Sequence, residues 1–326
     1  MVTVLSVVLA GGAGKRLQPL TLNQAKPALN FVYHRRVIDF VLSNLWHSAF
    51  YQLLVLTQYK PYRLHQHLLR HWQARFAKGG SLTIRQAPDE LVTGTAGAVA
   101  RELSLIHDYQ PDHVALLSAD HIYKMDYRQM LHFHQQQQAD LTVAAIAVPA
   151  DSAHQFGVFI VDENHCIQGF IEKPQGQVPQ IPDRPGFALV SMGNYLFRTS
   201  VLEQVLSMAL PGQDTDFGKH ILPQLITQGR CCVYDFSLNT LPGAQSLPHY
   251  WRDVGTLNSY FASRLDMLSH PDWLQGAQQA WPILGKRSYS ERLSAASTAL
   301  RQRRSKSWLS AIRPLAPAQH QHALYC

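Results

Sequence analysis

Apolar runs and helical stretches alternate along the first half of this sequence. Val4–Leu9 is an apolar run of strand length, and Val37–His47 places its apolar residues between Ile38 and Leu45 on one helical face. Strands that are almost continuously Val, Leu and Ile are typical of a mostly parallel sheet that helices cover on both faces. Further strands are predicted at Gln52–Thr57, Ser81–Arg85, His113–Leu117 and Leu141–Ala147, and further helices at Pro61–Trp72, Gly97–Ile106 and Tyr127–Gln137.

The pattern changes after residue 150, where short strands separated by turn residues replace the regular alternation. Residues 174–187 are rich in Pro, Gln and Gly, which predicts an exposed loop. The predicted fold class is α/β, with a mostly parallel mixed sheet and helices on both faces. We expect residues of about 1–150 to form the first half of this domain, and residues of about 151–285 to form a second half that folds as a substrate lobe onto the same sheet. Strands are predicted at Phe156–Val161, Cys166–Glu172 and Ala188–Phe197, and helices at Val201–Met208, Phe217–Gln228 and the end of Trp251–Leu268.

Charge changes this picture mainly near the end of the chain. The 326 residues are 46% hydrophobic, enough for one large core or two modest ones, and the net charge is +7. Residues 286–326 hold eight Lys or Arg and one acid, so they account for the whole excess. The sequence therefore predicts a domain over 1–285 and a basic tail over 286–326 that is disordered or partly helical. A neutral body lacks the charge distribution of a nucleic-acid-binding protein, so we expect no nucleic-acid partner.

Neither a membrane nor an oxidising compartment is indicated. No apolar run approaches the roughly 20 residues that a membrane span needs, and no basic leader precedes the first strand. The four cysteines, Cys166, Cys231, Cys232 and Cys326, have neither metal-site nor disulfide-framework spacing. We therefore expect a reducing cytoplasm.

A glycine-rich loop follows the first predicted strand. Gly11, Gly12 and Gly14 let backbone N–H groups approach a polyphosphate closely, and Arg16 and Lys26 add positive charge beside it. The spacing matches neither G-x-G-x-x-G nor G-x-x-x-x-G-K-[ST]. The loop is thus interpreted as a nucleoside triphosphate site, with a tight strand-to-helix turn as the alternative.

Two acids far apart in the sequence follow strand-like segments. Ligands of open α/β sheets bind at the carboxyl ends of strands, where Asp120 and Asp253 are expected. Carboxylates are preferred ligands of Mg²⁺, so the two could share one cation, and helix capping is the alternative for both. Glu172 and Lys173 end another strand, where they could hold sugar hydroxyls and a phosphate or form a surface ion pair.

Two other patterns carry no chemistry in this interpretation. Asp216–Gly218 matches a kinase tripeptide, but no H-R-D-x-x-x-x-N precedes it, so we treat that match as chance. The histidine pairs His65/His67 and His132/His134 are two residues apart, a spacing that does not bring two ligands to one helix face. No zinc site is predicted.

Several short motifs occur in a fixed order between residue 4 and Ile283. They are Leu9–Leu17, Ala25–Pro27, Arg36–Asn44, Thr57–Tyr59, Gly94–Ala96, Asp120–Lys124, Phe156–Val158, Glu172–Pro174, Ser191–Gly193, Asp216–Lys219 and Tyr250–Thr256. This set resembles the sugar-phosphate nucleotidyltransferases, and most of all the bacterial glucose-1-phosphate adenylyltransferases (ADP-glucose pyrophosphorylases).

The resemblance implies a transferase that moves AMP from ATP to α-D-glucose 1-phosphate and releases ADP-glucose and pyrophosphate, for glycogen synthesis. It implies Mg²⁺ as cofactor and an in-line attack without a covalent enzyme intermediate. It implies Gly11, Gly12, Gly14, Arg16 and Lys26 as triphosphate ligands, Gly94 and Thr95 as nucleotide contacts, Gly157, Glu172, Lys173 and Ser191 as glucose 1-phosphate contacts, and Asp120 and Asp253 as metal ligands. Arg16, Lys26 and Asp120 are the implied catalytic residues. The resemblance also implies that residues of about 1–150 form a nucleotide-binding half and residues of about 151–285 a sugar-phosphate-binding half.

The sequence departs from the family at several positions. Val92 replaces an aromatic residue, Gly97 an acid, Ala119 a glycine, and Asn23–Gln24 a basic pair. Family members also carry a C-terminal left-handed β-helix that helps assemble a homotetramer. No hexapeptide repeat is found here, so we expect no β-helix and leave the assembly open. The sequence from Leu284 on resembles nothing in the family, which suggests a truncation or a change of reading frame.

These departures keep three hypotheses open. The chain is an active adenylyltransferase, a catalytically weak or inactive regulatory or vestigial subunit, or a relative that uses another sugar or base. Asp120, Lys173 and Asp253 are all retained, although a subunit released from catalysis would be expected to lose such charged residues first. The sequence therefore favours the active enzyme.

Overall fold

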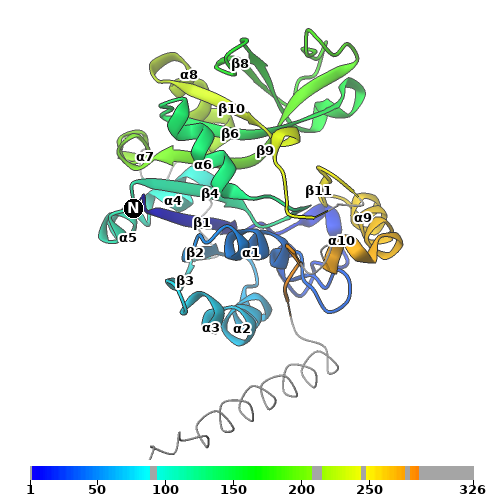
Figure 1. The fold of residues 1–326 in the computed structure, drawn as a ribbon. Helices are drawn as coiled ribbons and strands as arrows, with labels where there is room; N and C mark the ends of the chain where they lie inside the picture. The colour runs from blue at the N-terminus through cyan, green and yellow to red at the C-terminus, as the bar shows by residue number, and fades with distance from the viewer. Residues whose placement is uncertain (1, 89–93, 208–214, 244–246, 276–279, 286–326) are drawn as a thin grey trace, which may run out of the picture. The chain divides into compact units, whose positions relative to one another are not determined.

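A nine-stranded mixed sheet runs through the described part of the chain (Figure 1). The structure is a computed structural model and describes residues 2–88, 94–207, 215–243, 247–275 and 280–285. The strands of this sheet are β1 (Val4–Ala10), β2 (Gln52–Thr57), β3 (Ser81–Gln86), β4 (His113–Ser118), β6 (Leu141–Pro149), β7 (Gly157–Val161), β8 (Ile167–Glu172), β9 (Phe187–Arg198) and β10 (Cys231–Asp235).

The strand order is β10-β6-β9-β4-β1-β2-β3, and β7 and β8 extend from β9. β1 pairs in parallel with β2 and β4, β2 with β3, and β6 with β10. β9 runs antiparallel to β4, β6 and β7, and β7 runs antiparallel to β8. The fold class predicted from the sequence is confirmed.

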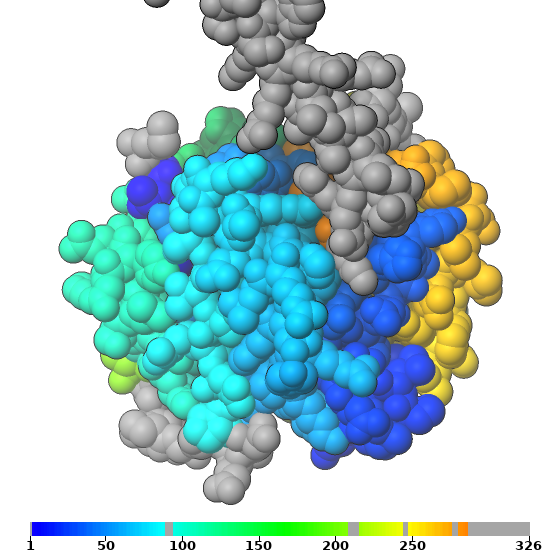
Figure 2. Space-filling model, turned by 90° about the horizontal axis from the view of Figure 1, so that it is seen from below, coloured from blue at the N-terminus to red at the C-terminus, as the bar shows by residue number. Residues whose placement is uncertain are grey.

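Two groups of helices cover the two faces of the sheet. Alternate residues of β1 divide between the faces, since Val8 packs in one core and Leu5 and Val7 in the other. The first core contains side chains of α1 (Ile38–His47), α2 (Tyr62–His71), α3 (Gln73–Phe76) and α6 (Tyr127–Gln136). The second contains side chains of α4 (Gly94–Ala100), α5 (Leu103–Tyr109), α7 (Thr199–Ser207) and α8 (Leu222–Gln228). Figure 2 views the molecule from the side of α2 and α3, with α9 and α10 at the edge in yellow and orange.

A third core joins the loop after β1 to the last described helices. Leu17, Phe31 and Phe40 pack here with Ile122, Val254 and Trp273, all at most 2% exposed. The elements that meet are a short two-stranded sheet of β5 (His121–Tyr123) and β11 (Trp251–Asp253), and the helices α9 (Leu257–Ser269) and α10 (Pro271–Gln275). This core brings residue 26 and residue 253 to the same end of the sheet. It also buries Phe40, so α1 is apolar on two sides rather than on one.

The remaining elements are single turns. They are η1 (Lys15–Leu17), η2 (Lys26–Ala28), η3 (Ala150–Gln155), η4 (Phe217–Ile221) and η5 (Phe236–Leu238).

Several elements differ from the sequence prediction. The helix predicted over Gly97–Ile106 is split into α4 and α5, and Arg101 and Glu102 lie between them. The helix predicted over Phe217–Gln228 is η4 followed by α8, because Pro223 lies in the first turn of α8 and starts a new helix there. β10 has no predicted counterpart, since its Cys-Cys start resembles no strand signal.

Some predictions fall outside the described residues. These concern Val92, the last residue of the helix predicted at Val201–Met208, and the tail 286–326. Residues 1–285 form one structural unit, and the division into two halves stays a prediction. Among the described helices, none combines the length and the apolar composition needed to cross a membrane.

Candidate active site

One cavity of about 880 Å³ lies at the carboxyl ends of β1, β2 and β4. It extends from the glycine-rich loop to the end of β8 and the middle of β9. Among the residues singled out from the sequence, those that line it are Gly11, Gly12, Lys26, Gly94, Thr95, Asp120, Gly157, Glu172, Lys173, Ser191 and Asp253. The fold therefore gathers segments more than 200 residues apart around one space.

The glycine-rich loop begins directly after β1. A Cβ added to Gly12 would meet nothing within 4 Å, so the backbone there faces open space. Gly14 has a φ of 59°, in the left-handed region that favours glycine, and its carbonyl accepts a hydrogen bond from the Thr21 hydroxyl at 2.9 Å. A Cβ at Gly14 would lie 3.1 Å from the Cβ of Lys26. Gly14 therefore shapes the turn under Lys26 and does not itself line the cavity.

Lys26 lies between the two acids that the sequence singled out. Its Nζ donates to Asp120 Oδ2 at 2.7 Å and to Asp253 Oδ1 at 3.0 Å, and the residue is only 5% exposed. Burial alone would lower the pKa of Lys26, but the two carboxylates outweigh it and raise that pKa. Burial would likewise raise the pKa of Asp120, but Lys26 and His121 outweigh it and lower that pKa well below its usual range. Lys26 and Asp120 are therefore both charged at neutral pH.

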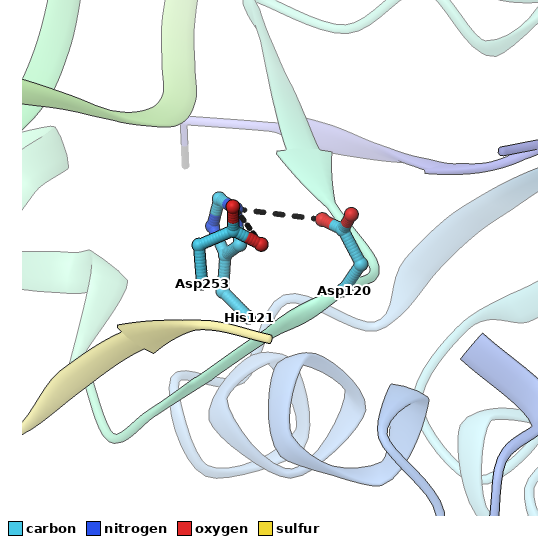
Figure 3. A group of neighbouring side chains, drawn as sticks. All are labelled: Asp120, His121 and Asp253. Carbon is cyan, nitrogen blue, oxygen red and sulfur yellow. Dashed lines mark ion pairs between the residues drawn. The ribbon is translucent and has the colours of Figure 1, made fainter. Parts of the chain in front are cut away.

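The strand pair β5–β11 explains why Asp253 lies near Asp120. In their antiparallel register Asp253 is opposite His121, the residue after Asp120 (Figure 3). His121 Nε2 lies 3.4 Å from Asp120 Oδ1 and 4.0 Å from Asp253 Oδ1. The Ser118 hydroxyl also donates to Asp120 Oδ1.

These three side chains form a group that could hold a metal ion. One ligand atom from each of Asp120, His121 and Asp253 lies within 4.8 Å of the others. Two carboxylates fit a hard cation such as Mg²⁺, whereas an imidazole is a ligand more typical of transition metals. The two acids predicted as metal ligands are therefore together, and the structure adds His121 beside them.

Arg16 is placed differently from the other predicted triphosphate ligands. It is exposed and does not line the cavity as bounded by the described residues. A Cβ added to Gly255 would lie 2.9 Å from Arg16 Nη2 and 2.8 Å from Asp253 Oδ2. Gly255 thus leaves room for the guanidinium beside Asp253.

The end of β8 supplies an acid and a base at the far end of the cavity. Glu172 Oε1 and Lys173 Nζ are 3.1 Å apart, and the Lys173 side chain is 56% exposed. A Cβ on Gly157 would lie 2.3 Å from the Phe170 ring and 3.0 Å from Glu172 Oε2. Only glycine therefore fits at 157 next to this carboxylate, which explains the Phe-Gly-Val motif by packing.

Alternate residues of β9 form the wall between the two ends. Ser191, Gly193 and Tyr195 all line the cavity, as expected for every second residue of a strand. Burial, together with the nearby Asp216 and Glu172 carboxylates, raises the pKa of Tyr195, so its hydroxyl stays protonated. Tyr195 is therefore a hydrogen-bond donor close to two acids.

Thr95 connects the start of α4 to the segment before η4. Its hydroxyl donates to Asp216 Oδ2 at 2.8 Å and accepts from the backbone N–H of Phe217 at 3.1 Å. Asp216 in turn caps η4, because its Oδ1 accepts from the N–H of Gly218 at 2.9 Å. Thr95 was singled out as a nucleotide contact, and this structure gives its hydroxyl the Asp216 carboxylate as partner.

Two departures from the family pattern are accommodated by the fold. Ala119 is 1% exposed within the core that contains α1, and its N–H donates to the Leu9 carbonyl at 3.2 Å. Gly97 lies in α4, and its N–H donates to the Thr215 carbonyl at 3.3 Å. Among the described residues, the ion pairs of Lys26 are with two aspartates, and neither Ala119 nor Gly97 is a partner in them.

Sequence reasoning did not assign roles to several cavity residues. Tyr195 could have been found from the sequence, because it is four positions after Ser191 on a predicted strand and therefore points to the same face. Asp216 stood in a motif that was treated as a chance kinase match, and its partner Thr95 is 121 residues away. Only the strand register showed His121 and Trp251 at the site. The cavity residues without an assigned role include Gln58, Tyr59, His121, Gly193, Tyr195, Asp216, Phe217, Gly218 and Trp251.

Comparisons of the sequence with known proteins show what this chain is similar to. A sequence model of a family described as nucleotidyl transferase matches residues 5–270. The chain is 43% identical over 300 residues to a glucose-1-phosphate adenylyltransferase of Mycobacteroides abscessus, covering 90% of this chain and 73% of that protein. It is also 43% identical over 296 residues to a glucose-1-phosphate adenylyltransferase of Thermodesulfovibrio yellowstonii, covering 87% and 71%. A protein of the same name from Mycolicibacterium smegmatis is 42% identical over 300 residues.

Proposed function

We propose that this chain transfers AMP from ATP to α-D-glucose 1-phosphate. The chain belongs to the nucleotidyl transferase family and, within it, to the glucose-1-phosphate adenylyltransferases. The products are ADP-glucose and pyrophosphate, and the pathway served is glycogen synthesis in the cytoplasm. The observation that carries this proposal is the position of Lys26, Asp120 and Asp253 between the two ends of one cavity.

The end formed by the glycine-rich loop would hold the triphosphate. Backbone N–H groups around Gly11 and Gly12 are suited to phosphate oxygens, and Lys26 would add positive charge near the α-phosphate. Arg16 would act from outside the cavity, beside Asp253. Gly94, which also lines the cavity, would contact the nucleotide.

The end formed by β8 and β9 would hold glucose 1-phosphate. Lys173 would bind its phosphate, and Glu172 and Ser191 would accept or donate hydrogen bonds to sugar hydroxyls. Gly157 would keep the backbone close to the sugar. An oxygen of the sugar phosphate would then attack the α-phosphorus in line, and pyrophosphate would leave from the opposite side.

Asp120 and Asp253 fit a divalent cation by the chemistry of their oxygens, and we propose Mg²⁺. Such an ion would neutralise the charge that develops on the phosphoryl oxygens during transfer. The chain's own residues would keep the two carboxylates in place, through the Ser118 hydroxyl on Asp120 and the β5–β11 register at Asp253. The homotetramer implied by the resemblance stays a prediction.

The test is release of pyrophosphate from ATP and glucose 1-phosphate in the presence of Mg²⁺. We expect the wild type to be active and Asp120→Asn to lose about 10²- to 10³-fold in kcat, because a preorganised charge at the reacting phosphate is removed. Asp108→Asn, an exposed acid away from the cavity, should be unchanged. If the wild type releases no more pyrophosphate than Asp120→Asn, the proposal is wrong. The result would then favour the alternative of an inactive regulatory or vestigial subunit.

A further inference from the structure

The structure brings together two cysteines that the sequence separates by 66 residues. Cys166 directly precedes β8, Cys232 is the second residue of β10, and their Sγ atoms are 3.9 Å apart. Both are free thiols in this structure. Figure 1 shows β8 and β10 next to each other at the top of the view. The pair is outside the proposed active site, since neither residue lines its cavity.

The backbone between these residues has the geometry of a closely spaced cross-strand pair. Cys166 and Cys232 are antiparallel bridge partners, and the N–H of Val233 donates to the carbonyl of His165 at 2.8 Å. The hydrogen bonds thus flank the pair rather than join it. In such non-hydrogen-bonded pairs the Cα atoms are about 4.5 Å apart, within the range of about 4.4–6.8 Å that disulfides span. A disulfide would require the sulfurs to approach by about 1.9 Å, to about 2.0 Å.

The neighbouring Cys231 does not share this geometry. Successive residues of a strand point to opposite faces, and Cys231 belongs to the buried core that contains α7 and α8. Cys232 is the residue that faces Cys166. The chain therefore carries a matched control for the pair at the adjacent position.

We propose that Cys166 and Cys232 are a redox-sensitive pair that forms an intramolecular disulfide when a small-molecule disulfide oxidises the reduced chain. Cys166 is partly exposed and meets the oxidant first, whereas Cys232 is fully buried. The Cys166 thiolate attacks one sulfur of the oxidant, which forms a mixed disulfide and releases one thiol. The Cys232 sulfur then attacks Cys166 Sγ, its proton passes to the leaving thiolate, and a second thiol is released. Two protein thiols thus lose two electrons and two protons, and the oxidant gains them.

Burial of Cys232 slows the second step, in which its sulfur attacks Cys166 Sγ. Burial, then the nearby Cys166, raises the pKa of the Cys232 thiol to about 12, so little thiolate is present at neutral pH. Disulfide closure should therefore accelerate as the pH rises. Intracellular disulfides of this kind are generally transient and sense redox conditions.

The disulfide would act on the hairpin that carries part of the sugar end. Among the described residues, the β7–β8 hairpin pairs with the rest of the main sheet at two places. Val158 and Phe159 of β7 pair with β9, and Cys166 pairs with Cys232 of β10. β8 leads from Cys166 directly to Glu172. A covalent bond would draw the start of β8 toward β10, and Glu172 is on the same strand. On the basis of the proposed function, we expect oxidation to weaken binding of glucose 1-phosphate more than binding of ATP.

The first test follows the bond itself and needs no activity. The full-length reduced chain is incubated with glutathione disulfide over a range of pH, free thiols are alkylated, and the linked peptides are identified by mass spectrometry. We expect the Cys166–Cys232 link in the wild type and in Cys231→Ser, formed faster at higher pH, and its loss in Cys166→Ser and Cys232→Ser. Absence of the link, or a link through Cys231 or Cys326 instead, would overturn the proposal.

The second test compares KM values of the oxidised and the reduced enzyme. We expect the KM for glucose 1-phosphate to rise about threefold or more on oxidation, the KM for ATP to change less, and Cys232→Ser to be insensitive. An unchanged or lower KM for glucose 1-phosphate in fully oxidised protein would overturn the proposed effect on the hairpin. Failure of the adenylyltransferase proposal looks different, because the reduced wild type would then release no pyrophosphate at all.

Discussion

The two sides of the sheet build opposite ends of one cavity by different means. On the parallel side (β1, β2, β3 and β4), cavity residues lie at or just after the carboxyl ends of strands, as Gly11 follows β1, Gln58 follows β2 and Asp120 follows β4. On the mixed side (β6 to β10), they lie within a strand, as Ser191 and Tyr195 do in β9, or on a hairpin that pairs with it.

This difference shows two ways of fixing a side chain. On the parallel side the carboxyl ends of neighbouring strands meet at one edge whatever the details of pairing, so topology alone gathers the loops. On the mixed side the antiparallel register decides which residues face the cavity, and a slip by one residue would turn Ser191 and Tyr195 to the other face. The placement of cavity residues on the parallel side therefore depends less on strand register than the placement of Ser191 and Tyr195 does.

Removal of the charge that joins the two sides should have the largest effect. Lys26→Met leaves Asp120 and Asp253 without their shared cation, and we expect kcat to fall about 10²- to 10³-fold. Lys78→Met, which removes an exposed lysine outside the cavity, is the matched control. Steady-state pyrophosphate release measures both. Full activity of Lys26→Met would show that the ion pairs only support the fold.

A smaller, one-sided effect is expected at the end of β8. Lys173→Ala removes a charged contact to the sugar phosphate, so the KM for glucose 1-phosphate should rise about tenfold and the KM for ATP should change little. Lys219→Ala removes an exposed charge that does not line the cavity and should change neither. An equal rise of both KM values would remove the distinction between the two sides.

Thr95 tests whether a residue of one side can act on the other. Thr95→Val breaks the hydrogen bond to Asp216, and we expect the KM for glucose 1-phosphate to rise about fivefold. This rise corresponds to a loss of about 1 kcal/mol of binding free energy. Thr95→Ser keeps the hydroxyl and should restore the wild-type value. If the KM for ATP rises instead, Thr95 contacts the nucleotide, as the family resemblance implies.

The smallest effect concerns acid stability of the mixed side. His134 in α6 is 1% exposed, and burial, then His113 and Arg198, lowers its pKa to about 3. The unfolded chain takes up a proton near pH 6.5 that the folded His134 does not, so stability falls as the pH drops from about 6.5 toward 3. We expect a loss of about 1 kcal/mol between pH 7.5 and 5.5, measured by urea unfolding.

His134→Asn should flatten this slope, whatever its stability at pH 7.5. The Lys26–Asp120 pair should contribute nothing to the change in unfolding free energy between about pH 7.5 and 5.5. The pKa of Asp120 is lowered and that of Lys26 is raised, so stability from this pair is lost only below about pH 4 or above about pH 10. An unchanged slope in His134→Asn would assign the acid sensitivity to another group.

Much of the parallel side could be predicted from the sequence. The strand predicted at Gln52–Thr57 has the observed bounds of β2, and Ile38 and Leu45 are buried as the helical pattern indicates. Parallel strands are buried on both faces, so their apolar runs are easy to recognise. β5 and β11 escaped prediction because three residues are too few to show a period.

The sequence by itself determined the α/β class, the glycine-rich loop and the identity of the charged residues, because these depend on local composition and spacing. Only the tertiary structure decided which of these charges meet. Lys26, Asp120 and Asp253 come together through the third core and the β5–β11 register, and Cys166 meets Cys232 through a strand pair across 66 residues. Contacts between distant segments depend on how whole elements pack and pair, and no local pattern encodes that.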